Sequence, residues 1–248
     1  MKKGLFITFE GLEGCGKTTQ AKMLYNFLIE QGCPSVYTKE PGGTKIGQKV
    51  RRILLDQKND GMDYKTEMLL FLASRAENVR LVILPALEKE KIVISDRFYD
   101  STTAYQGYGR GIDLKTIRYL NNFVVGKAIP DLTFFLDIEP YEGLRRSTSF
   151  GNSREIRFEE EFINKKIIEG KLFLERVRDG YYHLFREEAE RIKIIDANRS
   201  KEEIYNEIVE IVKRKIADST NSIYYVVGAY CIRPDSAQYT ILDTKILS

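Results

Sequence analysis

The sequence contains no tryptophan, one histidine and three cysteines in 248 residues, and each scarcity excludes a kind of site. With His183 alone and no Cys-x-x-Cys pair, a metal centre built from histidines and cysteines is excluded. A Ser-His-Asp triad is possible only if His183 serves it. Cys15, Cys33 and Cys231 are scattered and odd in number, so we expect no disulfide framework and a cytoplasmic location.

A large charge of one sign and a long apolar run are also missing. The 39 Lys and Arg residues exceed the 36 Asp and Glu residues by only +3, which does not indicate a nucleic-acid-binding protein. No stretch approaches the roughly 18 apolar residues that cross a bilayer. The apolar run at residues 5–9 is too short for a secretory signal. We therefore expect neither a nucleic-acid partner nor a membrane association.

What the sequence does contain is an alternation of short apolar runs with longer amphipathic ones. The pattern predicts buried strands at residues 5–9, 36–39, 92–95, 132–136 and 192–195, and helices at 18–31, 46–55, 66–87 and 201–215. Pro85 is expected to bend or end the helix at 66–87. Such alternation is typical of a doubly wound parallel sheet with helices on both faces, so the predicted fold class is α/β.

Two segments depart from this alternation. Residues 145–171 are dense in charge, and on composition alone they favour a solvated helical hairpin. Residues 218–222 resemble a linker, and residues 223–227 are strand-like. This tail is compatible with an added edge strand, a docking segment or a poorly ordered end.

The strongest motif is Gly11-Leu12-Glu13-Gly14-Cys15-Gly16-Lys17-Thr18, which fits G-x-x-x-x-G-K-[ST] without a mismatch. It follows a predicted strand and opens a predicted helix, as a phosphate-binding loop must. Its glycines let backbone N–H groups converge on phosphate oxygens, Lys17 reaches the β- and γ-phosphates, and the Thr18 hydroxyl completes a magnesium shell. The predicted ligands are therefore ATP and Mg²⁺, and Thr19 extends the loop. Cys15 fits this loop by its small size, with a redox role as the alternative.

The residues after the strand at 92–95 indicate the reaction class. A switch GTPase carries Asn-Lys-x-Asp, whereas Asn164-Lys165 here lacks the aspartate. A motor ATPase usually ends this strand in two acids, whereas this chain has Asp96 followed by Arg97. An arginine next to the predicted metal-proximal aspartate suits a second phosphorylated substrate, which favours a kinase. A P-loop binding or switch protein without kinase activity is the alternative from another class.

Six ordered motifs also resemble those of the thymidylate kinases, over roughly residues 4–216. They lie at 9–19, 40–44, 70–75, 96–98, 105–111 and 130–133. The resemblance implies a nucleoside monophosphate kinase domain at 1–216 with a helical lid at about 140–172, and an extension of unknown role at 217–248. It implies transfer of the γ-phosphate of ATP to dTMP, giving dTDP and ADP for dTTP biosynthesis, by a homodimer. A kinase for another nucleotide or nucleoside, and a catalytically inactive relative, are the alternatives.

The resemblance also assigns roles to individual side chains. Phe71 would stack on thymine, Arg75 would donate to a base carbonyl, and Glu13 would accept from the sugar 3′-hydroxyl. Arg97 and Arg51 would hold the acceptor phosphate. The other substrate-binding candidates are Glu40, Thr102, Tyr105 and Gln106, and Tyr105 would crowd a ribose 2′-hydroxyl. The metal candidates are Thr18 and Asp96, and the catalytic candidates are Lys17, Asp96, Arg97, Arg146 and Arg157.

In the family, the mobile catalytic arginine lies either in the phosphate loop or in the lid. Gly14 occupies the loop position here, so the resemblance implies that the lid supplies it. The candidates are Arg145, Arg146, Arg154 and Arg157, with Arg146 and Arg157 favoured and Arg154 next. The loop at 196–199 would flank the adenine. The chain departs from the family at Asn78, where a histidine is expected, and in a longer helical run after Arg157.

Overall fold

The structure is a computed structural model, and it describes residues 4–149, 167–217, 225–227 and 230–232. In this part of the chain, the central sheet has five parallel strands in the order β2-β3-β1-β4-β5. The strands are β1 (Phe6–Glu10), β2 (Ser35–Lys39), β3 (Ile92–Asp96), β4 (Leu132–Asp137) and β5 (Ile192–Asp196). Each predicted strand is present with bounds within one residue, and the doubly wound α/β prediction is confirmed.

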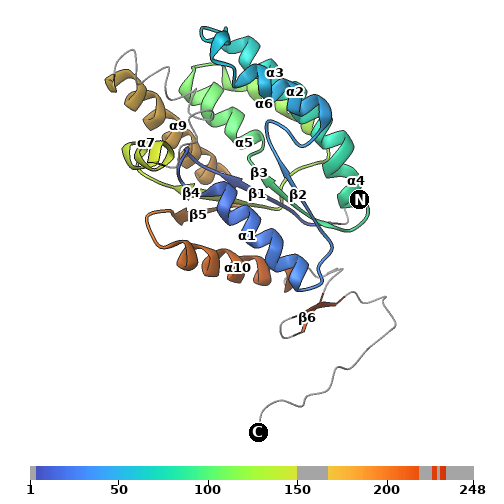
Figure 1. Ribbon diagram of the computed structural model, residues 1–248. Helices are drawn as coiled ribbons and strands as arrows, with labels where there is room; N and C mark the ends of the chain where they lie inside the picture. Colours follow the sequence, from blue (N-terminus) through green and yellow to red (C-terminus); the bar gives the residue numbers. More distant parts are fainter. Residues whose placement is uncertain (1–3, 150–166, 218–224, 228–229, 233–248) are drawn as a thin grey trace.

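Alternate side chains of the strands explain why helices cover both faces of the sheet (Figure 1). Ile7 and Phe9 pack on one face against α1 (Lys17–Glu30) and α10 (Lys201–Ala217). Phe6 and Val93 point to the other face, toward η2 (Val79–Ile83), α4 (Leu84–Glu88) and α6 (Leu114–Val125). Burial of both faces accounts for the continuous apolar runs in the sequence.

The remaining helices lie around the carboxyl ends of the strands or above the sheet (Figure 1). They are α2 (Lys45–Leu54), η1 (Gln57–Asn59), α3 (Tyr64–Asn78), α5 (Tyr99–Thr102), η3 (Thr103–Gly109), α7 (Pro140–Ser149) and α9 (Ile167–Glu187). Both η2 and η3 are π-helical. The described parts of the charged stretch at 145–171 are helical, since they lie in α7 and α9. Residues 150–166 lie outside the described residues.

The helix predicted at 66–87 is three consecutive segments, α3, η2 and α4. Pro85 is the second residue of α4, which continues directly from the π-helical η2. The irregularity is a π-helical stretch directly before Pro85, and the helical run ends at Glu88, so Pro85 does not end the helix.

Two further sequence-based expectations concern the cysteines and the tail. Cys33 is disulfide-bonded, so the expectation of no disulfide is wrong at this residue, whereas Cys15 is free and buried. Strands β6 (Tyr225–Val227) and β7 (Tyr230–Ile232) pair antiparallel in a sheet of their own. The described part of the tail is therefore not an edge strand of the central sheet. No helix in the described ranges is long and apolar enough to cross a membrane.

Candidate active site

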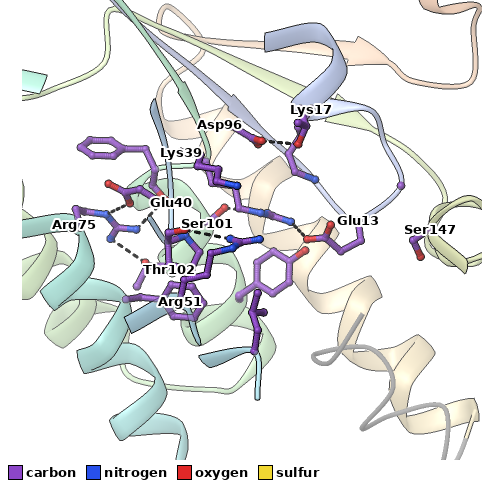
Figure 2. A pocket seen from close by; sticks show the side chains of 18 of the residues that line it. Glu13, Lys17, Lys39, Glu40, Arg51, Arg75, Asp96, Ser101, Thr102 and Ser147 are labelled. Carbon is purple, nitrogen blue, oxygen red and sulfur yellow. Dashed lines mark hydrogen bonds and ion pairs between the residues drawn. The ribbon is translucent and has the colours of Figure 1, made fainter. Parts of the chain in front are cut away.

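A cavity of about 620 Å³ opens at the carboxyl ends of β1, β2 and β3. In an open parallel sheet this edge is where ligands bind, because loops and helix N-termini converge there. Figure 2 shows Lys17 and Asp96 on one side of the cavity and Arg75, Glu40 and Thr102 on the other. Of the predicted site residues, the cavity lining includes Glu13, Gly14, Gly16, Lys17, Thr18, Thr19, Glu40, Arg51, Phe71, Arg75, Asp96, Arg97, Thr102, Tyr105 and Gln106.

The loop between β1 and α1 has the conformation that phosphate binding requires. Gly14 and Gly16 have φ angles of 72° and 93°, in the left-handed region that favours glycine. A Cβ at Gly14 would lie 2.1 Å from the carbonyl oxygen of Gly143 in α7, so the close approach of α7 excludes a side chain there. The buried Lys17 donates from Nζ to the carbonyl of Leu12 at 2.6 Å.

Thr18 and Asp96 bring two oxygen ligands together from different elements. The Thr18 hydroxyl at the start of α1 donates to the Asp96 carboxylate at the end of β3 at 2.5 Å. The described residues contain no cluster of three His, Cys, Asp or Glu side chains that would enclose a metal ion. A hydroxyl and a carboxylate suit Mg²⁺, since this ion retains waters and phosphate oxygens for its remaining positions.

Arg97 spans the space between the phosphate loop and α5. Its Nη1 donates to the carbonyl of Gly11 at 3.0 Å and to the hydroxyl of Ser101 at 3.1 Å, and its Nη2 forms an ion pair with Glu13. Burial acts to raise the pKa of Glu13, but Arg97 and then Lys17 outweigh it and hold this pKa below its usual value. Arg97 is therefore a fixed positive charge at the mouth of the phosphate loop.

Arg75 forms the far wall of the cavity and is almost fully buried. Its Nε donates to Glu40 at 2.7 Å, its Nη1 to Thr102 and Asn121, and its Nη2 to the carbonyl of Phe98. These bonds use four of the five N–H groups of a guanidinium, and the fifth is on Nη2. Burial raises the pKa of Glu40, although Arg75 opposes the shift. Asn121 of α6 belongs to this wall and has no local signal in the sequence.

Asn78 occupies the position where the sequence resemblance leads us to expect a histidine. Its amide donates to Glu40 at 3.1 Å and accepts from Thr38 at 2.7 Å. Asn78 therefore holds the carboxylate that orients Arg75, so it supports the wall rather than lining the cavity.

Helix η3 supplies the inner side of the cavity. Gln106 donates to the buried Glu67 at 2.8 Å, which fixes its amide. The Tyr105 ring lies beside the Arg97 guanidinium, 5.2 Å from ring centroid to Cζ, and is 8% exposed. Arg51 reaches the cavity from α2 and donates to the Pro41 carbonyl at 3.1 Å. The structure thus brings Tyr105, Arg51 and Arg97, which the sequence resemblance named, to one cavity.

The lid arginines divide into two groups. Arg145 and Arg146 lie on α7, and both pair with Glu142. Arg146 also donates to the Ala197 carbonyl at 2.8 Å, in the loop predicted to flank adenine. Neither lines the cavity. Arg154 and Arg157 lie outside the described residues.

Sequence reasoning missed several residues of the site. Lys39, Ser101 and Ser147 line the cavity, and Figure 2 labels them. Ser101 lies in α5, whereas Arg97 precedes this helix with a φ angle of 70°, so helical spacing could not have indicated their contact. Lys39 ends β2 and is paired in register with Asp96, a placement that only the sheet order reveals.

The phosphate loop, the aspartate at the adjacent strand end and the parallel sheet define the P-loop nucleoside monophosphate kinase fold. The thymidylate kinase family model matches residues 9–208. The chain is 45% identical over 212 residues to thymidylate kinase from Halothermothrix orenii, covering 85% of this chain and 97% of that one. It is 45% identical over 219 residues to thymidylate kinase from Geotalea uraniireducens, covering 87% and 99%.

A solved structure agrees with these relatives. The crystal structure of thymidylate kinase from Ehrlichia chaffeensis superimposes with a TM-score of 0.65 at 34% identity, covering 84% of this chain and 98% of that chain. The chain therefore belongs to the thymidylate kinase family, and it is an enzyme that phosphorylates dTMP.

Proposed function

We propose that the chain transfers the γ-phosphate of ATP directly to the phosphate of dTMP, giving dTDP and ADP for dTTP synthesis. The observation that carries this proposal is one cavity that joins Lys17 and Asp96 at one end to Phe71 and Arg75 at the other. The first end has the charge and oxygen ligands for a nucleoside triphosphate, and the second has the flat apolar ring and donor for a base.

The donor half of the reaction follows from the loop between β1 and α1. Residues 11–19 bind the phosphates of ATP through backbone N–H groups and the α1 N-terminus. Lys17 moves from the Leu12 carbonyl to the β- and γ-phosphates, where its charge stabilises the transferring group. Thr18 and Asp96 would hold Mg²⁺, which would supply positive charge to neutralise the phosphates.

The acceptor half uses the opposite wall. Phe71 stacks on thymine, and the fifth N–H of Arg75 donates to a base carbonyl. Arg97 and Arg51 hold the acceptor phosphate, because a guanidinium fork matches two phosphate oxygens. Glu13 accepts from the 3′-hydroxyl, and the acceptor oxygen is already anionic, so in-line attack requires no strong base. Glu40, Thr102 and Gln106 shape this pocket.

We assign the mobile catalytic arginine to the lid. The approach of Gly143 to Gly14 supports this assignment, because no arginine fits at residue 14 of the loop. Arg146 and Arg157 are the proposed residues, and the lid at about 140–172 carries them to the γ-phosphate as it closes.

Coupled ADP release with dTMP, dUMP, dCMP and dGMP side by side tests the proposed function. We expect dTMP to give the highest kcat/KM, and Lys17→Ala to lose at least about 10²-fold in turnover because its charge is felt in the transition state. The exposed Lys49→Ala is the matched control. A higher kcat/KM with another acceptor would assign the site to that nucleotide, and wild-type turnover in Lys17→Ala would contradict the phosphate-loop role.

We further propose a homodimer formed through α3 and α6. These helices pack on each other through Met68, Leu72 and Ile117, while Tyr119 and Phe123 on α6 are 71% and 79% exposed. Two large apolar side chains one turn apart suit a second copy of the same face. Sedimentation velocity should give a dimer for the intact chain and a monomer for Phe123→Glu.

The proposed catalytic unit is residues 1–216, with residues 217–248 as an extension of unknown role. The end of α10 and the end of the family match at residue 208 support this boundary. We propose a cytoplasmic location, where ATP and the deoxynucleotides are available. The Cys33 disulfide is more typical of an oxidising compartment. Alkylation of cell lysates under denaturing conditions tests the location, because a reduced Cys33 thiol would support the cytoplasm and an oxidised one would not.

A further inference from the structure

Arg97 holds its position through an unusual backbone conformation. Its φ angle is +70°, in the left-handed region that side chains other than glycine, asparagine and aspartate rarely adopt. Three hydrogen bonds surround this residue: its N–H donates to the Phe9 carbonyl at 2.9 Å, Ser95 donates to its carbonyl at 2.7 Å, and the next N–H, of Phe98, donates to Glu10 at 2.7 Å. Such a conformation persists only where its surroundings determine it.

Glu10, the last residue of β1, accepts three hydrogen bonds, two from α5 and its N-cap and one from α9. Its Oε1 accepts the Phe98 N–H, and its Oε2 accepts the hydroxyls of Ser101 at 2.5 Å and Tyr181 at 3.1 Å. Ser101 in turn accepts from Nη1 of Arg97. One fully buried carboxylate therefore contacts the backbone next to Arg97, the hydroxyl that holds its guanidinium, and α9.

Glu10 does not line the cavity, and neither does Tyr181. Neither residue takes part in phosphate binding by the loop between β1 and α1, or in the wall of the cavity that Arg75 forms. A buried carboxylate is costly unless donors satisfy it. Two of the three donors to Glu10, the Phe98 N–H and the Ser101 hydroxyl, adjoin Arg97, the residue proposed to face the acceptor phosphate.

We propose that Glu10, with Ser101 and Tyr181, is a positioning residue that sets both the backbone and the guanidinium of Arg97 for the acceptor phosphate. The inference rests on the proposed role of Arg97 in holding that phosphate. Tyr181 lies on α9, the helix that follows the lid. Glu10 therefore links α9 to the acceptor site, and a shift of α9 would change the position of Arg97. Glutamine at residue 10 would still accept from the Phe98 N–H. Its amide NH₂ would face the hydroxyls of Ser101 and Tyr181, which donate to the carboxylate in the wild-type chain.

The test compares Ser101→Ala, Tyr181→Phe and Glu10→Gln with the wild-type chain. Equilibrium affinity is measured for dTMP and for thymidine, which lacks the phosphate, together with KM for ATP and the melting temperature. We expect dTMP affinity to fall about tenfold in each variant, since hydrogen bonds to charged groups are worth about this much. Thymidine affinity and KM for ATP should change less than twofold.

Tyr182→Phe is the matched control on the same helix. Its hydroxyl donates to Asp137 at 2.7 Å, so the variant removes a comparable bond to a carboxylate outside this network. It should leave dTMP affinity unchanged. In an Arg97→Met background, Ser101→Ala should produce no further loss, because the side chain that it positions is absent.

Two results would overturn the inference. One is an equal loss of dTMP and thymidine affinity, which would assign the network to general stability; the other is unchanged dTMP affinity in Ser101→Ala and Tyr181→Phe. If Glu10→Gln does not fold, these two variants decide alone. Failure of the proposed function looks different, because Arg97→Met itself would then bind dTMP normally.

Discussion

At the scale of single residues, Tyr105 is a candidate determinant of sugar specificity. Its ring packs edge-on against Phe173, with centroids 6.2 Å apart, and lies against Arg97. We predict that Tyr105→Ala raises kcat/KM for ribonucleotide acceptors relative to deoxynucleotides, because it opens space for a 2′-hydroxyl. Turnover of dTMP and of ribothymidine monophosphate gives the ratio. Tyr105→Phe keeps the ring and should keep the ratio, and an unchanged ratio in the alanine variant would remove Tyr105 from the sugar pocket.

Cys15 lies inside the phosphate loop, and its thiol is a weak nucleophile. Burial raises its pKa, although Lys17 opposes the shift, so the thiolate is scarce at neutral pH. We predict that iodoacetamide modifies Cys15 at pH 8 at least about tenfold more slowly than the same residue in the unfolded chain, and that the rate is still rising above pH 9. Peptide mapping after timed alkylation measures this rate. Rapid modification at pH 7 would instead support the redox role.

At the scale of elements, the contact between α9 and η3 depends on two glycines. A Cβ at Gly109 would lie 2.6 Å from the Phe173 ring, and one at Gly180 would lie 2.7 Å from the Tyr108 ring. We predict that Gly109→Ala and Gly180→Ala each lower the free energy of unfolding by about 1–3 kcal/mol, because an extra methyl overpacks this contact. Urea denaturation measures the change. The exposed Asp179→Ala on α9 should change it by less than about 0.5 kcal/mol.

The lid gives the second prediction at this scale. Alanine at a transition-state arginine should cut turnover by about 10²–10³-fold and barely change dTMP affinity, since the contact forms only on closure. We expect this result at Arg146 or Arg157, with Arg154 next. Arg80→Ala, which removes an exposed arginine from η2, should cost almost nothing. If all the lid variants retain near-normal turnover, residues 145–171 are the solvated hairpin that composition alone favours.

The strands and the phosphate loop could be predicted from the sequence because their signals are local. The apolar residues Ile92-Val93-Ile94 mark a buried strand, and the loop that contains Gly16-Lys17-Thr18 begins directly after β1. The network around Glu10 could not be predicted, because Ser101 and Tyr181 lie 91 and 171 residues away along the chain. The π-helical segments could not be predicted either, since their side chains repeat almost as in an α-helix.

At the scale of the whole molecule, the tail can be separated from the catalytic unit by experiment. Every predicted motif lies upstream of α10, and the family match ends at residue 208. We predict that a chain ending after Ala217 keeps at least about half of the wild-type kcat/KM for dTMP, because no cavity residue is removed. Circular dichroism and sedimentation are the controls. A chain that folds normally but loses transfer would place the tail in the active site or the dimer.

The position of β1 in the sheet has a consequence for how the chain is made. β1 leaves the ribosome before the other strands of the central sheet, but its two neighbours are β3, which begins at Ile92, and β4, which begins at Leu132. At about 5–20 residues per second, the strand that carries the phosphate loop waits roughly 6–25 s for its second neighbour. During that time at least one edge of an apolar strand is unpaired, so the nascent chain is open to mispairing for longer than a protein built from sequential hairpins.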